Sequence, residues 1–169
     1  MTEVKIKDSI LQKAATEGMD AFIGAIVQAT YDAVGGDLTA ETMAMLTSDQ
    51  ITLLAWSILH EEVMDGGYVQ LIHNGYGAFI FHNPFAIAMR EWGLNDVYTH
   101  VKRARRLYEK YHEVIERDYT DDEFMALFEQ MPEFDDFDDE FVEMEELWTA
   151  QVAEYVDEHI EQFVTITDE

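Results

Sequence analysis

Hydrophobic residues recur at helical spacing along most of this chain. Residues 19–34 are apolar almost all round and end at the pair Gly35-Gly36, which predicts a buried helix. Thr47 lies three residues before Gln50, the spacing of a capping box, and predicts a second helix that runs to Gly66-Gly67. The apolar positions of this second helix are Ile51, Leu54, Ile58, Leu59 and Val63.

The middle of the chain predicts short elements followed by one long helix. Glycines at positions 75 and 77 favour short elements over residues 68–82. Pro84 suits the first turn of a helix with Asn83 as its cap and Gly93 at its end. A longer amphipathic helix is expected over residues 95–118. Its apolar face consists of Val97, Val101, Ala104, Leu107, Tyr108, Tyr111 and Ile115.

The last third of the chain combines an aromatic face with an acidic one. A short helix is expected over residues 119–131, with acids in its first turn, where the helix dipole favours them. Beyond it, apolar residues recur every three to five positions, namely Phe134, Phe137, Phe141, Met144, Trp148, Val152, Tyr155, Ile160 and Phe163. The opposite face of this last helix carries Asp139, Glu140, Glu143, Glu145, Glu146, Glu154, Asp157, Glu158 and Glu161. This periodicity predicts a long helix docked by its aromatic side, with carboxylates displayed to solvent.

The composition agrees with a helical protein. Only two prolines occur among 169 residues, and 48% of the residues are hydrophobic, which is enough for a packed core. We therefore expect an all-α fold, a single compact domain that ends in the long acidic helix. Within it, residues 1–46 form N-terminal helices and residues 47–164 form the main helical domain.

The charge is extreme and regional. The chain holds 36 Asp and Glu against 10 Lys and Arg, a formal net charge of -26. Residues 118–169 contain 20 of these acids and no Lys or Arg, whereas residues 1–117 have a net charge of only -6. Direct binding to nucleic acid is therefore excluded as an expectation, because little could neutralise phosphates. The absence of cysteine, of a long apolar run and of a signal-peptide core predicts a cytoplasmic protein that does not span a membrane.

The enzyme and metal-site motifs found in this sequence are incomplete. Glu109 and His112 have the Glu-x-x-His spacing of di-iron bundles, but a second copy is missing. Residues 135–140 resemble a calcium loop only in their acids, since Phe137 interrupts them and the turn glycine is absent. We expect no enzyme activity and no catalytic, cofactor-binding or metal-binding residues. A metal-dependent enzyme using Glu109, His112 and acids of the last helix remains one alternative.

One basic cluster stands out against the acidic background. It consists of Lys102, Arg103, Arg105 and Arg106. Contact with nucleic acid or with an acidic partner is one interpretation of this cluster. In a protein of this charge, pairing with its own carboxylates, within the chain or across a dimer, is the favoured one.

The spacing of the acids suggests more than a solvated face. Nine carboxylates between Asp139 and Glu161 amount to about one charge per 4 Å of helix, close to one phosphate per about 3.4 Å on a DNA strand. A protein groove that receives DNA would experience a comparable field. The candidate partner-binding acids are Asp121, Asp122, Glu129, Asp135, Asp136, Asp138, Asp139, Glu143, Glu146, Glu154, Asp157, Glu158 and Glu161.

Two blocks of the sequence resemble the bacterial DNA mimic protein family. Residues 62–70, followed by Asn74 and Gly75, are similar to its Glu-Val-x-Asn-Gly-Gly-aromatic-x-Gln stretch, although Asp65 stands where the family usually has Asn. Residues 134–141 resemble its second block. The resemblance implies an all-helical homodimer that presents a DNA-like array of carboxylates, binds a helix-turn-helix transcription factor and blocks its binding to operator DNA. It implies scaffold roles for Gln70, Asn74 and the glycines, and no enzyme activity.

Two further alternatives remain open at the level of sequence. An immunity or antirestriction-type inhibitor would use the same charges to occupy the DNA site of a nuclease. A halophilic housekeeping domain would also be acidic, but the ordinary balance of residues 1–117 argues against it, since salt adaptation should spread over the whole surface.

Overall fold

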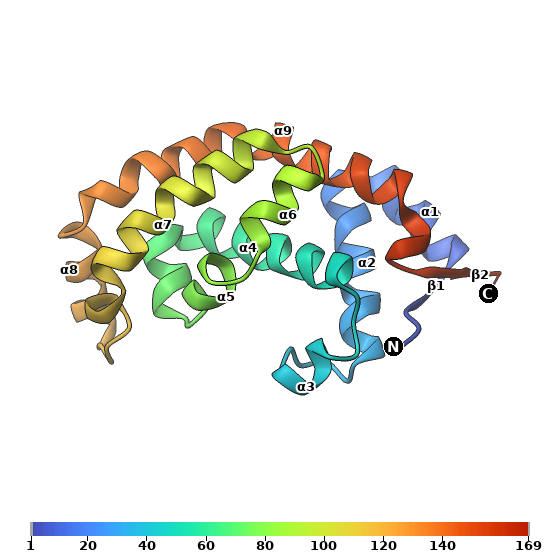
Figure 1. Ribbon diagram of the computed structural model, residues 1–169, viewed down its shortest axis with the longest axis horizontal. Coiled ribbons are helices and arrows are strands. Elements are labelled where there is room, and N and C mark those ends of the chain that lie inside the picture. The colour runs from blue at the N-terminus through green and yellow to red at the C-terminus, as the bar shows by residue number, and fades with distance from the viewer. Residues whose placement is uncertain (1, 169) are drawn as a thin grey trace. The chain divides into compact units, whose positions relative to one another are not determined.

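The computed structural model describes residues 2–168 and is built almost entirely of helices (Figure 1). The all-α prediction is confirmed, with one small sheet added. The elements are β1 (Lys5–Lys7), α1 (Asp8–Glu17), α2 (Met19–Ala33), α3 (Ala40–Met43), α4 (Ser48–His73), α5 (Gly77–Phe81), α6 (Phe85–Glu91), α7 (Asn95–Ile115), α8 (Asp121–Glu129), η1 (Pro132–Phe134), α9 (Asp135–Glu158), η2 (Ile160–Gln162) and β2 (Thr165–Thr167).

The chain divides into two compact units. The first holds the residues up to Ser57 together with those from Thr149 onward, and the second holds Ile58–Trp148. The expectation of a single domain stays a prediction. Among the described residues, no helix combines the length and the apolar character needed to cross a membrane.

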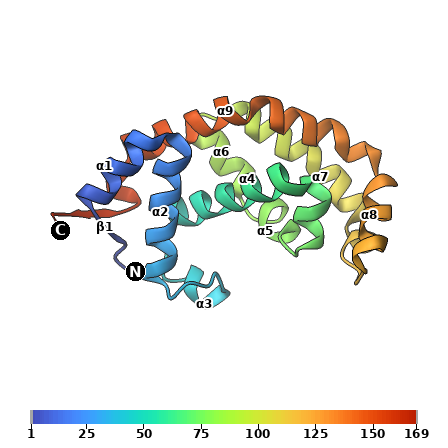
Figure 2. The ribbon, with the colours of Figure 1, turned by 180° about the vertical axis from the view of Figure 1, so that it is seen from behind.

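The first unit joins the two ends of the chain. Strands β1 and β2 pair in parallel, with Ile6 opposite Ile166, and lie side by side in Figure 2. The hydrophobic pattern does not predict this sheet, because each strand has only three residues and its partner is distant in sequence. Helices α1 and α2 pack on each other, and the helix predicted over residues 19–34 is found as α2. It is buried along one face only, at Phe22, Ile23, Ile26, Val27 and Thr30, so the prediction that it is buried all round is wrong.

A capping box starts α4, as predicted. The Thr47 backbone N–H donates to Gln50 Oε1 (2.9 Å), and the Gln50 N–H donates to Thr47 Oγ1 (3.1 Å). The Gln50 side chain is buried and also donates through Nε2 to the Phe163 carbonyl (2.8 Å). The start of α4 is thus tied to the chain segment that follows α9.

In the second unit, α4 is broken where the glycine pair predicts a break. Gly67 has a φ of 76°, in the region that favours glycine, and interrupts the helical backbone. The prediction that short elements follow is confirmed, because residues 68–73 form a short helical segment after the break and α5 comes next.

Two further predictions for this unit need correction. Asn83 does not cap α6; its side-chain amide donates to the Phe79 carbonyl (2.8 Å) and closes α5, and Pro84 takes the cap position of α6. Helix α7 ends at Ile115, so residues 116–118 lie outside it. Thr120 forms a capping box with Glu123 at the start of α8, which explains why the next helix begins there.

The core of the second unit forms around α7. Helices α5 and α6 pack on it, and its apolar face is buried as predicted at Val97, Val101, Ala104, Tyr108 and Ile115. The predicted aromatic face of α9 contributes fully buried Phe141 and Trp148. This docking leaves the remaining sides of α9 to the acids.

Gln50 provides a test of the tie to Phe163. Gln50→Glu keeps the acceptor for the Thr47 N–H but removes the amide donor and sets a carboxylate against the Phe163 carbonyl. We expect the free energy of unfolding to fall by about 2 kcal/mol in urea denaturation. Thr47→Ala is the matched control, which loses only the cap at a cost of about 1 kcal/mol. Equal losses in both variants would contradict a stabilising contact with Phe163.

Candidate partner-binding surface

Most of the candidate acids lie exposed on α8, α9 and η2. In the second unit, the exposed ones are Asp121, Asp122, Glu129, Asp135, Asp136, Asp139, Glu143 and Glu146. In the first unit, the exposed ones are Glu154, Asp157, Glu158 and Glu161, the last of which lies in η2 rather than in the long helix.

Four acids of α9 form one continuous line, which we call the acidic stripe: Asp135, Asp139, Glu143 and Glu146. Their spacing of four, four and three residues places them on one helix face, at steps of about 4.5 to 6 Å along the axis. Val142 and Leu147 lie among these acids with exposed fractions of 55% and 50%. The pattern of aromatic residues gave no signal for these two exposed apolar side chains.

Asp138 is the one candidate acid that the structure turns inward. Its Oδ1 accepts a hydrogen bond from the backbone N–H of Tyr68 (2.8 Å), just after the break in α4. A Cβ on Gly67 would lie 2.4 Å from Asp138 Oδ2, so glycine is needed there for close approach as well as for its positive φ. Burial raises the pKa of Asp138 to about 6, and the charges of Asp135 and Asp139 add to this rise, whereas the bond from Tyr68 opposes it.

Glu140 also turns inward and binds a buried histidine. His100, 1% exposed, donates through Nδ1 to Glu140 Oε1 (2.5 Å), and its Nε2 lies 2.9 Å from the Tyr68 hydroxyl. Burial lowers the pKa of His100 and raises that of Tyr68. A neutral imidazole can donate to the carboxylate while it accepts from the tyrosine hydroxyl. The chain Glu140–His100–Tyr68 therefore connects α9 to α7 and α4.

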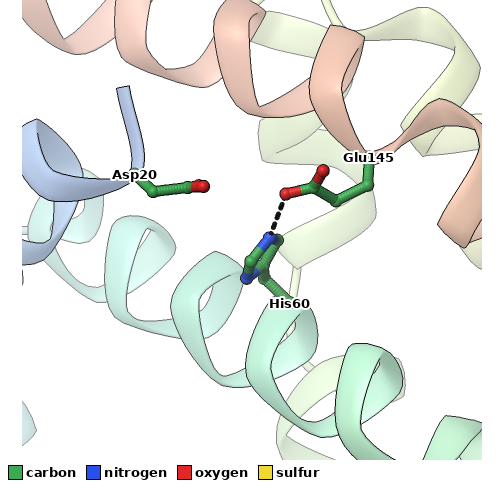
Figure 3. Close-up of side chains that lie close together, drawn as sticks. All are labelled: Asp20, His60 and Glu145. Atoms are coloured by element: carbon green, nitrogen blue, oxygen red, sulfur yellow. Dashed lines mark hydrogen bonds and ion pairs between the residues drawn. The ribbon is translucent and has the colours of Figure 1, made fainter. Parts of the chain in front are cut away.

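Glu145 is the third acid of α9 engaged by the protein itself. Its Oε1 lies 2.7 Å from His60 Nε2 on α4 (Figure 3, where the Asp20 also drawn belongs to the other unit). The prediction that Glu145 belongs to the displayed face is therefore wrong, because its side chain is only 14% exposed. The Glu140 side chain stays 42% exposed while it binds His100. Together with Asp138, these acids fix the rotation of α9 and leave the acidic stripe pointing to solvent.

Hydrogen bonds donated by side-chain amides surround the break in α4, next to Gly66 and Gly67. Gln70 Nε2 donates to Glu62 Oε2 (2.6 Å) and to Asp65 Oδ2 (3.0 Å). The Asn74 amide donates to both oxygens of Glu62, at 3.1 and 3.2 Å. These bonds join the helix before the break to the helix after it, in agreement with the scaffold role that the resemblance implies.

The candidate metal ligands Glu109 and His112 pair with residues close to them in sequence. The described residues of the basic cluster form few ion pairs. Glu109 pairs with Arg105 (2.8 Å) within α7, and His112 Nδ1 lies 2.5 Å from Oε1 of Glu116, the residue that follows α7, so both candidate ligands have local partners. Pairing of the basic cluster with the chain's own carboxylates is found for Arg105 alone among its four described members.

Comparison with known proteins places this arrangement in a family. Residues 44–159 match the model of the DMP19-like protein family, and the chain belongs to it. The chain is also 33% identical over 168 residues, 98% of both sequences, to the DNA mimic protein DMP19 of Neisseria meningitidis serogroup B (strain ATCC BAA-335 / MC58). The resemblance seen in the two sequence blocks is thereby confirmed.

The inward acid Asp138 gives a pH-dependent test. Because its pKa in the fold lies above the usual value of 3.8, the stability linked to its protonated form is present below about pH 4 and is lost as the pH rises through about 6. Asp138→Asn keeps an acceptor for the Tyr68 N–H without the charge. We expect this variant to melt at a higher temperature than the wild type at about pH 7.5 and at a similar temperature at about pH 4.

Asp138→Ala is the control for this test, because it removes the acceptor and leaves the Tyr68 N–H unpaired. It should melt at a lower temperature than the wild type at both pH values. If Asp138→Asn loses as much stability as Asp138→Ala at neutral pH, the ionised carboxylate of Asp138 does not destabilise the fold and our assignment is wrong.

Proposed function

We propose that this protein is a DNA mimic: it binds a DNA-binding protein, a helix-turn-helix transcription factor, and keeps it from its operator DNA. The observation that carries the proposal is the acidic stripe, a line of exposed carboxylates on a helix whose rotation is fixed by buried partners of its other acids. The similarity to the DNA mimic protein of Neisseria meningitidis supports mimicry of DNA. The helix-turn-helix partner follows from the family resemblance.

The acidic stripe is held rigidly, which supports mimicry of DNA. The phosphates of DNA are regularly spaced, and a DNA-reading surface holds its Arg and Lys side chains where they match that spacing. A disordered acidic segment could supply charge but would lose conformational entropy on binding. The acidic stripe avoids this loss, because Asp138, Glu140 and Glu145 already hold α9 against α4 and α7.

The exposed acids also produce a strong negative electrostatic field that extends over α8. Exposed acids of α8 extend the negative surface beyond the acidic stripe, since Asp121, Asp122 and Glu129 are exposed. A surface of one sign steers an oppositely charged partner and raises the association rate. A protein that binds DNA carries the complementary positive surface, and occupation of that surface excludes DNA.

We further propose that the protein acts as a homodimer in the cytoplasm and has no catalytic role, as the family resemblance implies. A nuclease inhibited at its DNA site is the alternative partner. The nuclease would contact the same carboxylates. The two proposals are separated by capturing the partner from a lysate of the source cell with the tagged protein and identifying it by mass spectrometry.

Neutralisation of the acidic stripe tests the proposal. The variant D135N/D139N/E143Q/E146Q should bind the captured partner at least about tenfold more weakly and fail to displace operator DNA in a gel-shift competition, because four charge pairs are lost. The matched control E17Q/D37N/E41Q/E91Q removes the same number of exposed acids outside the acidic stripe and should compete like the wild type. Circular dichroism should show equal helicity for all three proteins. Full competition by the acidic-stripe variant would contradict the proposal.

The salt dependence gives a second test. Affinity for the partner should fall steeply between about 50 mM and about 300 mM salt, as expected when ion pairs form at a protein surface. Isothermal titration calorimetry across this range measures the slope. An affinity that does not change with salt would show that the carboxylates are not what the partner recognises.

A further inference from the structure

Three cations of α7 have no carboxylate partner among residues 2–168, although the protein has a large excess of carboxylates. In the part of the chain that the structure describes, no acid lies within ion-pair distance of Lys102, Arg103 or Arg106, whereas the neighbouring Arg105 pairs with Glu109. We call Lys102, Arg103 and Arg106 the basic stripe. All three are exposed and lie within about one helical turn on the solvent face of α7.

The surroundings of the basic stripe are shaped rather than flat. A pocket of about 420 Å³ on α7 is lined by Tyr98, Thr99, Arg105 and the whole basic stripe, with Glu109 at its end. The Tyr98 ring faces two cations, with Arg90 Cζ at 4.8 Å and Lys102 Nζ at 6.0 Å from its centroid. These contacts with the ring restrict the cationic side chains without neutralising them.

The basic stripe borders the acids of α9. Helices α7 and α9 run side by side in both views (Figures 1 and 2), joined by the bond between His100 and Glu140. Arg103 Cζ lies 5.3 Å from the centroid of the Phe137 ring, and Phe137 directly follows the exposed acid Asp136. Within the second unit, a positive surface and a negative surface therefore lie next to each other.

The neighbouring acids decide which anion the basic stripe can receive. A nucleic acid strand along α7 would bring its phosphates within a Debye length, about 8 Å, of the carboxylates of α9, which repel it. A partner protein can place its own carboxylates against the basic stripe of α7 and its own Arg and Lys against the acids of α9. Both contacts are then favourable. Charge complementarity thus fits a partner with an acidic border next to a basic surface.

We propose, building on the proposed function, that the basic stripe binds carboxylates that border the DNA-reading surface of the partner. The fixed charges of DNA are all negative, so an acidic border repels DNA, whereas the basic stripe attracts that border. The contact therefore favours this protein over DNA for the same site, and it selects among DNA-binding proteins those with an acidic border.

Two labelled peptides test this contact with the full-length chain. The first is a helical peptide rich in Lys and Arg, and the second is the same peptide with a short run of Glu at one end. By fluorescence anisotropy, the wild type should bind the Glu-extended peptide about three- to tenfold more tightly, although that peptide has the smaller positive charge. The variant K102Q/R103Q/R106Q should bind the extended peptide less tightly than the plain one, and should bind the plain peptide at least as tightly as the wild type does.

The control K5Q/K7Q/K13Q removes three exposed cations from the other unit and should keep the wild-type preference. A wild type that prefers the plain peptide, or a K102Q/R103Q/R106Q variant that keeps the preference, would overturn the inference and leave the proposed function standing. If the wild type binds neither peptide at low salt, the acidic stripe attracts no basic probe, and the proposed function fails together with this inference.

Discussion

The organisation of the second unit depends on how α9 is held at its first turns. Asp138 reaches the backbone N–H of Tyr68 at the point where Gly67 breaks α4, and this approach is open only because Gly67 has no side chain. Glu140 binds His100 two residues later in α9, and His100 contacts the Tyr68 hydroxyl. Since both bonds converge on Tyr68, they fix the rotation of α9 about its axis and thereby decide which acids face solvent.

The acids of α9 therefore have two different tasks. Asp138, Glu140 and Glu145 accept hydrogen bonds from α4 and α7, and burial raises the pKa of Asp138 because its charge is partly desolvated. The acidic stripe stays in water, where its charges repel one another at a modest cost. This division explains how a segment so rich in carboxylates can fold as a helix and still present charge.

Much of the fold could be predicted from the sequence, since capping boxes, glycine breaks and helical periodicity are local signals. Thr47 with Gln50, and the break at Gly67, are examples. What periodicity could not supply were contacts between distant segments: the pairing of β1 with β2, the bond from Gln50 to Phe163, and the burial of Asp138. Asp138 lies four residues after Phe134 and three before Phe141, so helical spacing places it nearer the aromatic face than Asp139, but spacing does not reveal the Tyr68 N–H that Asp138 binds.

The central claim is that the outward side of α9, bordered by α7, covers the surface with which a partner reads DNA. Hydrogen–deuterium exchange of the complex with the captured partner tests this claim most directly. We predict slower exchange over residues 135–147 and 98–106 of this protein. In the partner, slower exchange is expected over the segment that operator DNA also protects. Protection elsewhere on this chain, or over partner segments that DNA leaves unchanged, would contradict the account.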